Sequence, residues 1–154
     1  MPKGRPDIGS WIFTVLIVVV AVGLFVRSSQ TAPVPEVFTS SAPTLDAAID
    51  LAQSSGKPVF AVATADWCPP CQSYKKGALS DPRVTAWLEE HTEPVYINVD
   101  ESPDDADRLG VRSIPASFIL ASDGTVIDGH SGKLSADTLL AWLEERAVSP
   151  AALD

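Results

Sequence analysis

The only two cysteines of the chain, Cys68 and Cys71, are separated by Pro69 and Pro70. They closely follow residues 59–64, a short and almost wholly apolar run that is typical of a strand buried on both faces of an α/β sheet. Pro69 fits the first turn of a helix, where its missing N–H matters least. The sequence therefore predicts a cysteine pair where a buried strand passes into a helix.

This position favours exchange between thiols and disulfides. The unpaired N–H groups and the dipole at a helix N-terminus stabilise a thiolate, so Cys68 is the candidate nucleophile. Cys71 is the candidate resolving thiol, which attacks a mixed disulfide between Cys68 and a substrate and closes a Cys68–Cys71 disulfide. Pro69 and Pro70 remove two N–H groups near the Cys68 sulfur, so we expect its pKa to be lowered less than in strong oxidants. This favours a reductase that needs no cofactor.

Two alternative functions remain open. Two thiolates at this spacing can form half of a zinc site or bind copper. The two histidines, His91 and His130, lie far apart in the sequence, and no second cysteine pair exists, so we expect no metal site. The second alternative is a non-catalytic adaptor that keeps the fold for binding alone.

The N-terminal part of the chain contains a long apolar run. Residues 8–26 carry no charge, and a helix of this length comes close to the roughly 30 Å of hydrocarbon in a bilayer. The run predicts a single transmembrane anchor. Because Lys3 and Arg5 precede it and Arg27 alone follows closely, the positive-inside rule places the tail, 1–7, in the cytoplasm and the rest in the periplasm or another extracytoplasmic space. A cleaved signal peptide is the competing interpretation.

Composition divides the remainder of the chain. Residues 27–43 are rich in Pro, Ser and Thr, which predicts a flexible linker. Residues 44–147 have the length and patterning of one globular domain, and 148–154 form a C-terminal tail. The formal net charge is -9 and the lysines and arginines are scattered, so nucleic acid is not an expected partner.

Helical and strand patterns alternate within 44–147. The expected helices lie at 44–56, from 69 to about 78, from 82 onward, within 101–109 and at 135–147, and the expected strands at 59–64, 94–100, 116–121 and 125–128. Such alternation predicts an α/β fold, a three-layer α/β/α sandwich with a mixed central sheet. The one transmembrane helix would precede it.

Three motifs together resemble the thioredoxin superfamily in order and spacing. They are ADWCPPC at 65–71, Ile114-Pro115, and SGKLS at 131–135. The sequences around 57–68 and 80–84 are most similar to exported thioredoxin-like domains such as the C-terminal periplasmic domain of DsbD. The resemblance implies a thioredoxin-like fold over about 44–147.

The resemblance also implies roles for individual residues. Ile114-Pro115 would be a cis peptide bond facing Cys68, and the backbone beside it would pair with an extended segment of the substrate. Trp67 would form part of the docking surface, whereas an ordinary core aromatic is the alternative. The implied partners are proteins with disulfides and a membrane or exported electron donor. Reduction of haem-attachment cysteines and general disulfide repair are both compatible with such partners.

The sequence departs from the thioredoxin pattern in one respect. In thioredoxins a buried aspartate and a nearby lysine assist deprotonation of the resolving cysteine, and the matching positions here are Val62 and Tyr96. Asp66 lies nearer to the thiols, where an exposed carboxylate would disfavour a thiolate. We therefore expect resolution by Cys71 to be slow or to rely on water.

Overall fold

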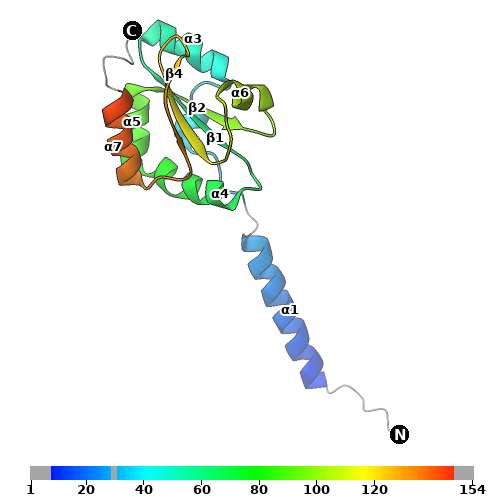
Figure 1. The fold of residues 1–154 in the computed structure, drawn as a ribbon. Helices are drawn as coiled ribbons and strands as arrows, with labels where there is room; N and C mark the ends of the chain where they lie inside the picture. Colours follow the sequence, from blue (N-terminus) through cyan, green and yellow to red (C-terminus); the bar gives the residue numbers. More distant parts are fainter. Residues whose placement is uncertain (1–7, 29–30, 148–154) are drawn as a thin grey trace. The chain divides into compact units, whose positions relative to one another are not determined.

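A computed structural model describes residues 8–28 and 31–147, and within helix α1 (Ile8–Ser28) it describes the side chains of residues 11–23. The expected tails, 1–7 and 148–154, lie outside the described residues. The chain divides into two units, one containing α1 and the other beginning at Ala32 (Figure 1). Among the residues described, no helix has both the length and the apolar character required to cross a membrane.

The second unit is built on a mixed sheet, as predicted. Its strands are β1 (Val59–Thr64), β2 (Glu93–Asn98), β3 (Ala116–Leu120) and β4 (Val126–Ser131), in the order β2-β1-β3-β4. Strand β1 runs parallel to β2 and antiparallel to β3, and β3 is antiparallel to β4. Every residue of β1 is buried, which confirms the central strand expected from its unbroken apolar run.

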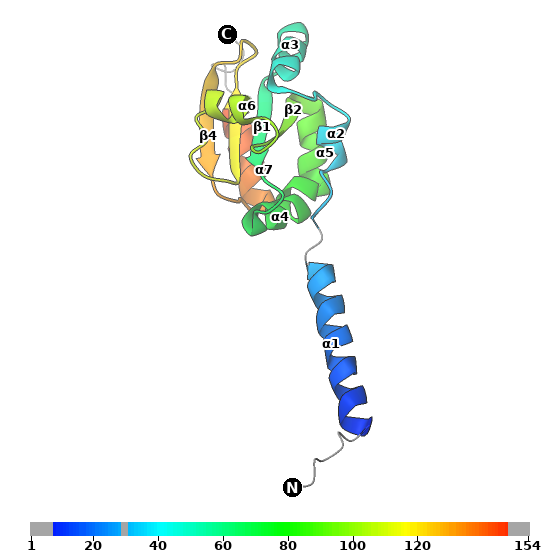
Figure 2. The ribbon, with the colours of Figure 1, turned by 90° about the vertical axis from the view of Figure 1, so that its right-hand side faces the viewer.

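Helices cover both faces of this sheet, which confirms the three layers (Figures 1 and 2). On one face lie α3 (Leu45–Ser55) and α6 (Pro103–Arg108); on the other lie α4 (Pro69–Lys76), α5 (Pro82–His91) and α7 (Ala136–Ala147). Successive side chains of β1 point to opposite faces. Phe60 and Val62 join the core under α5 and α7, whereas Ala61 and Ala63 join the core under α3.

Local chemistry fixes the helix ends. The Thr44 hydroxyl accepts a hydrogen bond from the Ala47 N–H at 3.2 Å, which confirms the predicted cap of α3. Gly56 ends the same helix with φ 74°, a conformation that a residue with a side chain rarely adopts. Asp81 caps α5, and Pro82 occupies its first turn.

The structure differs from the predicted linker. Residues 32–43 belong to the compact domain, and Glu36–Thr39 form the short helix α2. Val37 and Phe38 are buried in the same core as Phe60. A parallel bridge also joins Ala42 to Val95 of β2. The two apolar side chains pack in the core beside strands β1 and β2, and the apolar area that they bury outweighs the Pro- and Ser-rich composition around them.

Several element boundaries also differ from the predicted ones. Strand β2 begins and ends earlier than 94–100, and β4 extends to Ser131 rather than ending at 128. Helix α4 ends at Lys76, and residues Ala78–Ser80 form a separate 3-10 helix, η1. Gly77 marks the break, since a Cβ there would lie only 3.0 Å from the Ser73 carbonyl oxygen.

Candidate active site

The two cysteines lie at the start of α4 and are joined by a disulfide with a Cα–Cα distance of 5.2 Å. Cys68 is the N-cap residue, and its sulfur accepts a hydrogen bond from the Cys71 N–H at 3.3 Å. Pro69 and Pro70 fill the intervening positions and have no N–H to donate. The Cys71 amide is thus the first N–H of the helix that can reach the Cys68 sulfur.

The loop before β3 faces this disulfide. The Ile114–Pro115 peptide bond is cis, and the Ile114 carbonyl oxygen lies 3.9 Å from the Cys68 sulfur. On the other side, the Gly132 N–H donates to the Pro115 carbonyl oxygen at 2.7 Å. The structure therefore brings Cys68, Ile114 and Pro115 together, as the resemblance implies.

Trp67 lies on the surface beside the disulfide rather than in the core, with 69% of the residue exposed. Its indole N–H donates to the Asp100 carboxylate at 2.7 Å, which holds the ring in place. The ring lines a groove of about 310 Å³ together with Val99, Val111 and Ile114. The groove is mostly apolar, although Asp107 and Arg112 also line it.

A buried hydrogen bond connects α4, which carries the cysteines, to β3, which follows the cis proline. The Tyr74 hydroxyl on α4 lies 3.1 Å from the Ser117 hydroxyl on β3. Burial raises the pKa of Tyr74 to about 12, while the bond to Ser117 acts in the opposite direction. The phenol therefore stays neutral over the physiological range and keeps α4 in register with Pro115.

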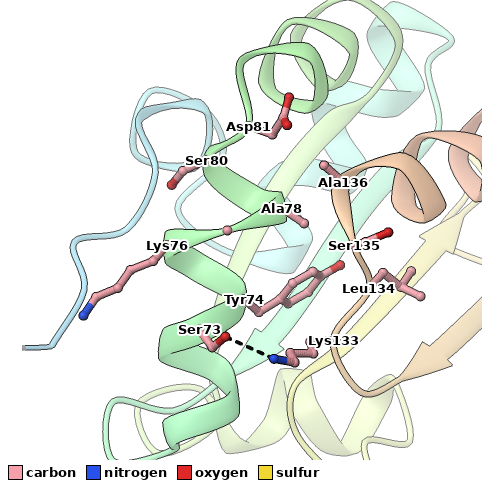
Figure 3. Close-up of a pocket in the computed structure, with 11 residues that line it drawn as sticks. Ser73, Tyr74, Lys76, Ala78, Ser80, Asp81, Lys133, Leu134, Ser135 and Ala136 are labelled. Carbon is pink, nitrogen blue, oxygen red and sulfur yellow. Dashed lines mark hydrogen bonds between the residues drawn. The ribbon is translucent and has the colours of Figure 1, made fainter.

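A second hollow, of about 570 Å³, lies at the C-terminal end of α4. Figure 3 shows the Lys133 ammonium turned toward Ser73, to which it donates at 3.2 Å, whereas Lys76 extends away from them. The hollow continues past Ala78 to Ser135, at the start of α7. Neither cysteine lines it, so it belongs to a different face from the disulfide.

Beneath the active site lies a small polar cluster. Val62 and Tyr96, the positions that match the thioredoxin aspartate and lysine, are register partners on β1 and β2. The Thr64 hydroxyl donates a hydrogen bond to the Tyr96 hydroxyl. Lys75 of α4 is buried, and its ammonium lies 3.2 Å from Asp66 and 5.6 Å from the centre of the Tyr96 ring. Asp66 is exposed, as expected, but it is also paired. Sequence reasoning missed Lys75, because nothing in the sequence distinguishes it from a surface lysine.

The histidines do not join the cysteines. His91 stacks on Trp87 at the end of α5, with 4.6 Å between ring centroids, and His130 lies on β4. Among the described residues, no three Cys, His, Asp or Glu side chains come together as metal ligands.

A cysteine pair that caps a helix, faces a cis-proline loop and rests on a mixed sheet defines the thioredoxin class of thiol–disulfide oxidoreductase. The sequence profile of the thioredoxin-like domain matches residues 45–147, so the chain belongs to this family.

Individual relatives agree with this assignment. The chain is 41% identical over 78 residues to thioredoxin 1 of Chlorobaculum tepidum, covering 51% of this chain and 71% of the relative. The structure is similar to a thioredoxin from Thermus thermophilus, with a TM-score of 0.59 and 27% identity over 67% of this chain and 82% of that one. It is also similar to the oxidised C-terminal domain of Neisseria meningitidis DsbD, with a TM-score of 0.56 and 28% identity over 66% and 92%. The family and the paired cysteines support thiol–disulfide oxidoreductase activity.

Proposed function

We propose that the protein is a membrane-anchored reductase of protein disulfides that works outside the cytoplasmic membrane through Cys68 and Cys71. The observation that carries this proposal is the position of the Cys68 sulfur. It caps α4 and lies 3.9 Å from the backbone beside the cis proline, where an extended substrate segment can approach it.

The proposed cycle balances without a cofactor. The Cys68 thiolate attacks one sulfur of a substrate disulfide, and the other substrate sulfur leaves as a thiolate and takes up a proton. Cys71 then loses its proton and attacks the Cys68 sulfur, which releases the substrate as a dithiol. The chain is left with the Cys68–Cys71 disulfide. Two electrons from a membrane or exported donor must then reduce this disulfide before the next turnover.

The two prolines support the proposed direction of electron flow. A side chain at the N-cap accepts from the N–H of the second or third helical residue, which are Pro70 and Cys71. Pro70 offers no N–H, so Cys71 is the one donor of this pair. Fewer donors stabilise the Cys68 thiolate less, and a less stable thiolate makes the reduced protein a better reductant.

The surface around the disulfide supports proteins as substrates. The groove lined by Trp67, Val99 and Ile114 is open and mostly apolar, and it can take a side chain next to the substrate cysteine. A small thiol such as glutathione would leave this groove largely unused. The DsbD C-terminal domain to which the chain is similar is a structure of the oxidised form.

The proposed anchor is residues 8–26, with one pass and a cytoplasmic N-terminus. The uncharged run in the sequence supports it, as do the positions of Lys3 and Arg5 before the run. In this arrangement the catalytic domain lies in the periplasm or an equivalent space.

Reduction of insulin by the full chain in detergent, with dithiothreitol as donor, tests the activity. We expect the wild type to precipitate the insulin B chain faster than buffer alone and Cys68→Ser to match buffer alone. Equal, background rates for both proteins would overturn the proposal.

The reduction potential of the Cys68–Cys71 pair tests the direction of electron flow. A value near that of thioredoxin, about -270 mV, supports a reductant, and one near about -120 mV would make the protein an oxidant.

Topology requires a separate experiment. The chain has no cysteine besides Cys68 and Cys71, so a thiol reagent reports on the catalytic domain alone. After reduction, a membrane-impermeant maleimide should label the protein in intact spheroplasts as fully as after lysis. Labelling that appears only after lysis would place the domain in the cytoplasm and refute the proposed location.

A further inference from the structure

Lys75 is a buried charge on the catalytic helix. Its side chain is 0% exposed, although lysine is almost never fully buried without a partner. The partner is Asp66, whose carboxylate lies 3.2 Å from the ammonium and whose side chain is 56% exposed. One charge of the pair is therefore shielded from water and the other is solvated. Since burying an ammonium ion costs free energy even in a pair, this position calls for a functional reason.

The helical spacing relates Lys75 to Cys71. Lys75 follows Cys71 by one helical turn, so the two side chains share a face of α4. Helical side chains lean toward the helix N-terminus, and Lys75 does so because Asp66, its partner, precedes the helix. The ammonium is thus carried back along the face that Cys71 occupies. Cys71 itself is 0% exposed.

The charges around this face favour a thiolate at Cys71. A buried sulfur anion is poorly solvated, so a cation near it has a large effect. Two other segments supply the groups in contact with Lys75: Asp66 from the loop before Cys68, and the Tyr96 ring from β2, whose hydroxyl is bonded to Thr64. The Asp66 carboxylate opposes the effect, but water screens its charge more than that of the buried ammonium.

We propose that Lys75 is a positioning residue for the resolving step, in which its buried ammonium favours the thiolate of Cys71. The Cys71 proton passes to water, and the thiolate attacks the Cys68 sulfur of the mixed disulfide. The bond between Cys68 and the substrate breaks, the substrate sulfur leaves as a thiolate and takes up a proton, and the Cys68–Cys71 bond forms. The inference rests on the proposed cycle through these two cysteines.

The two steps can be observed separately with Ellman's reagent. The reduced full chain in detergent is mixed with the reagent in a stopped-flow instrument over a range of pH. Attack by Cys68 releases the first thionitrobenzoate, and attack by Cys71 on the mixed disulfide releases the second. Lys75→Met removes the charge while keeping the length of the side chain. Lys76→Met, at the exposed neighbouring position, is the matched control.

In Lys75→Met we expect the inflection of the second phase to move up by about one pH unit. The thiolate fraction near neutral pH then falls about tenfold while its nucleophilicity rises about threefold, so the second phase slows about threefold. Above the inflection the order reverses, and the variant becomes about threefold faster than the wild type. Lys75→Arg and Lys76→Met should keep the wild-type profile.

An unchanged inflection in folded Lys75→Met would overturn the inference, and so would an equal slowing at every pH, which indicates a purely structural role. If Lys75→Met does not fold, Asp66→Asn is the second test. Loss of the exposed carboxylate should move the inflection of the second phase to lower pH, and an unchanged inflection would refute the inference. A wild type that releases only the first equivalent would refute the proposed cycle itself, which separates the two failures.

Discussion

Replacing Phe38 by alanine tests whether residues 32–43 belong to the folded domain. The Phe38 ring is buried and lies 6.2 Å, centroid to centroid, from each of the Phe60 and Tyr96 rings. Truncation of a buried phenylalanine costs about 3–5 kcal/mol, and the lower end applies because short α2 can relax into the space. We expect a loss of about 3 kcal/mol in the free energy of unfolding. In a domain of this size the melting temperature should fall by about 12 °C.

Thermal melts followed by circular dichroism measure this loss, and urea unfolding followed by tryptophan fluorescence provides an independent value. Thr39→Ala is the matched control, because Thr39 is exposed on the same short helix and its hydroxyl bonds only to the Glu36 carbonyl oxygen nearby. It should cost less than about 0.5 kcal/mol. If Phe38→Ala is no more destabilising than this control, residues 32–43 are a linker after all and the packing argument fails.

Three further changes probe the active site. Pro70→Ala restores an N–H that can reach the Cys68 sulfur, and the reduction potential should rise by about 30 mV in thiol–disulfide equilibration, whereas no rise would contradict the argument from the prolines. Trp67→Ala should leave the melting temperature nearly unchanged but lower kcat/KM for insulin by about tenfold, as the loss of an exposed contact residue predicts. With Tyr74 at a pKa of about 12 in the fold and near 10.0 unfolded, its contribution to stability is complete below pH 10 and is lost as the pH rises toward 12. Between about pH 8 and about pH 11, the free energy of unfolding measured in urea should fall by about 1 kcal/mol less in Tyr74→Phe than in the wild type. Parallel pH curves for the two proteins would contradict this.

Sequence patterns predict the sheet well where burial is complete. Strand β1 is an unbroken apolar run, so its bounds are those predicted. Strand β4 was predicted too short because its second half, Gly129 to Ser131, carries no apolar alternation. This strand lies at the sheet edge, where backbone pairing with β3 rather than side-chain burial maintains it. Propensity and hydrophobic pattern contain little information about such a strand.

Some residues of the candidate site could be predicted from the sequence and others could not. The cysteine pair and the cis proline depend on local sequence and on motif order, and both could be predicted. The burial of Lys75 depends on Asp66, Tyr96 and the path of three separate segments. Lysine is ordinarily a surface residue, so no single-sequence rule places it inside. The burial of Phe38 was missed because the prolines and serines around Val37 and Phe38 indicate a linker. Only the structure shows that these two apolar side chains pack against the sheet.

Gln72 connects the start of the compact domain to the loop that carries the catalytic sulfur. Its side-chain oxygen accepts from the Ala32 N–H at 2.6 Å, and its side-chain nitrogen donates to the Asp66 carbonyl oxygen at 2.9 Å. In a fusion protein, the compact domain would therefore have to be joined N-terminal to Ala32. A fusion joined at Thr44 would retain both cysteines but would lose the hydrogen bond from the Ala32 N–H to Gln72, the residue that follows Cys71.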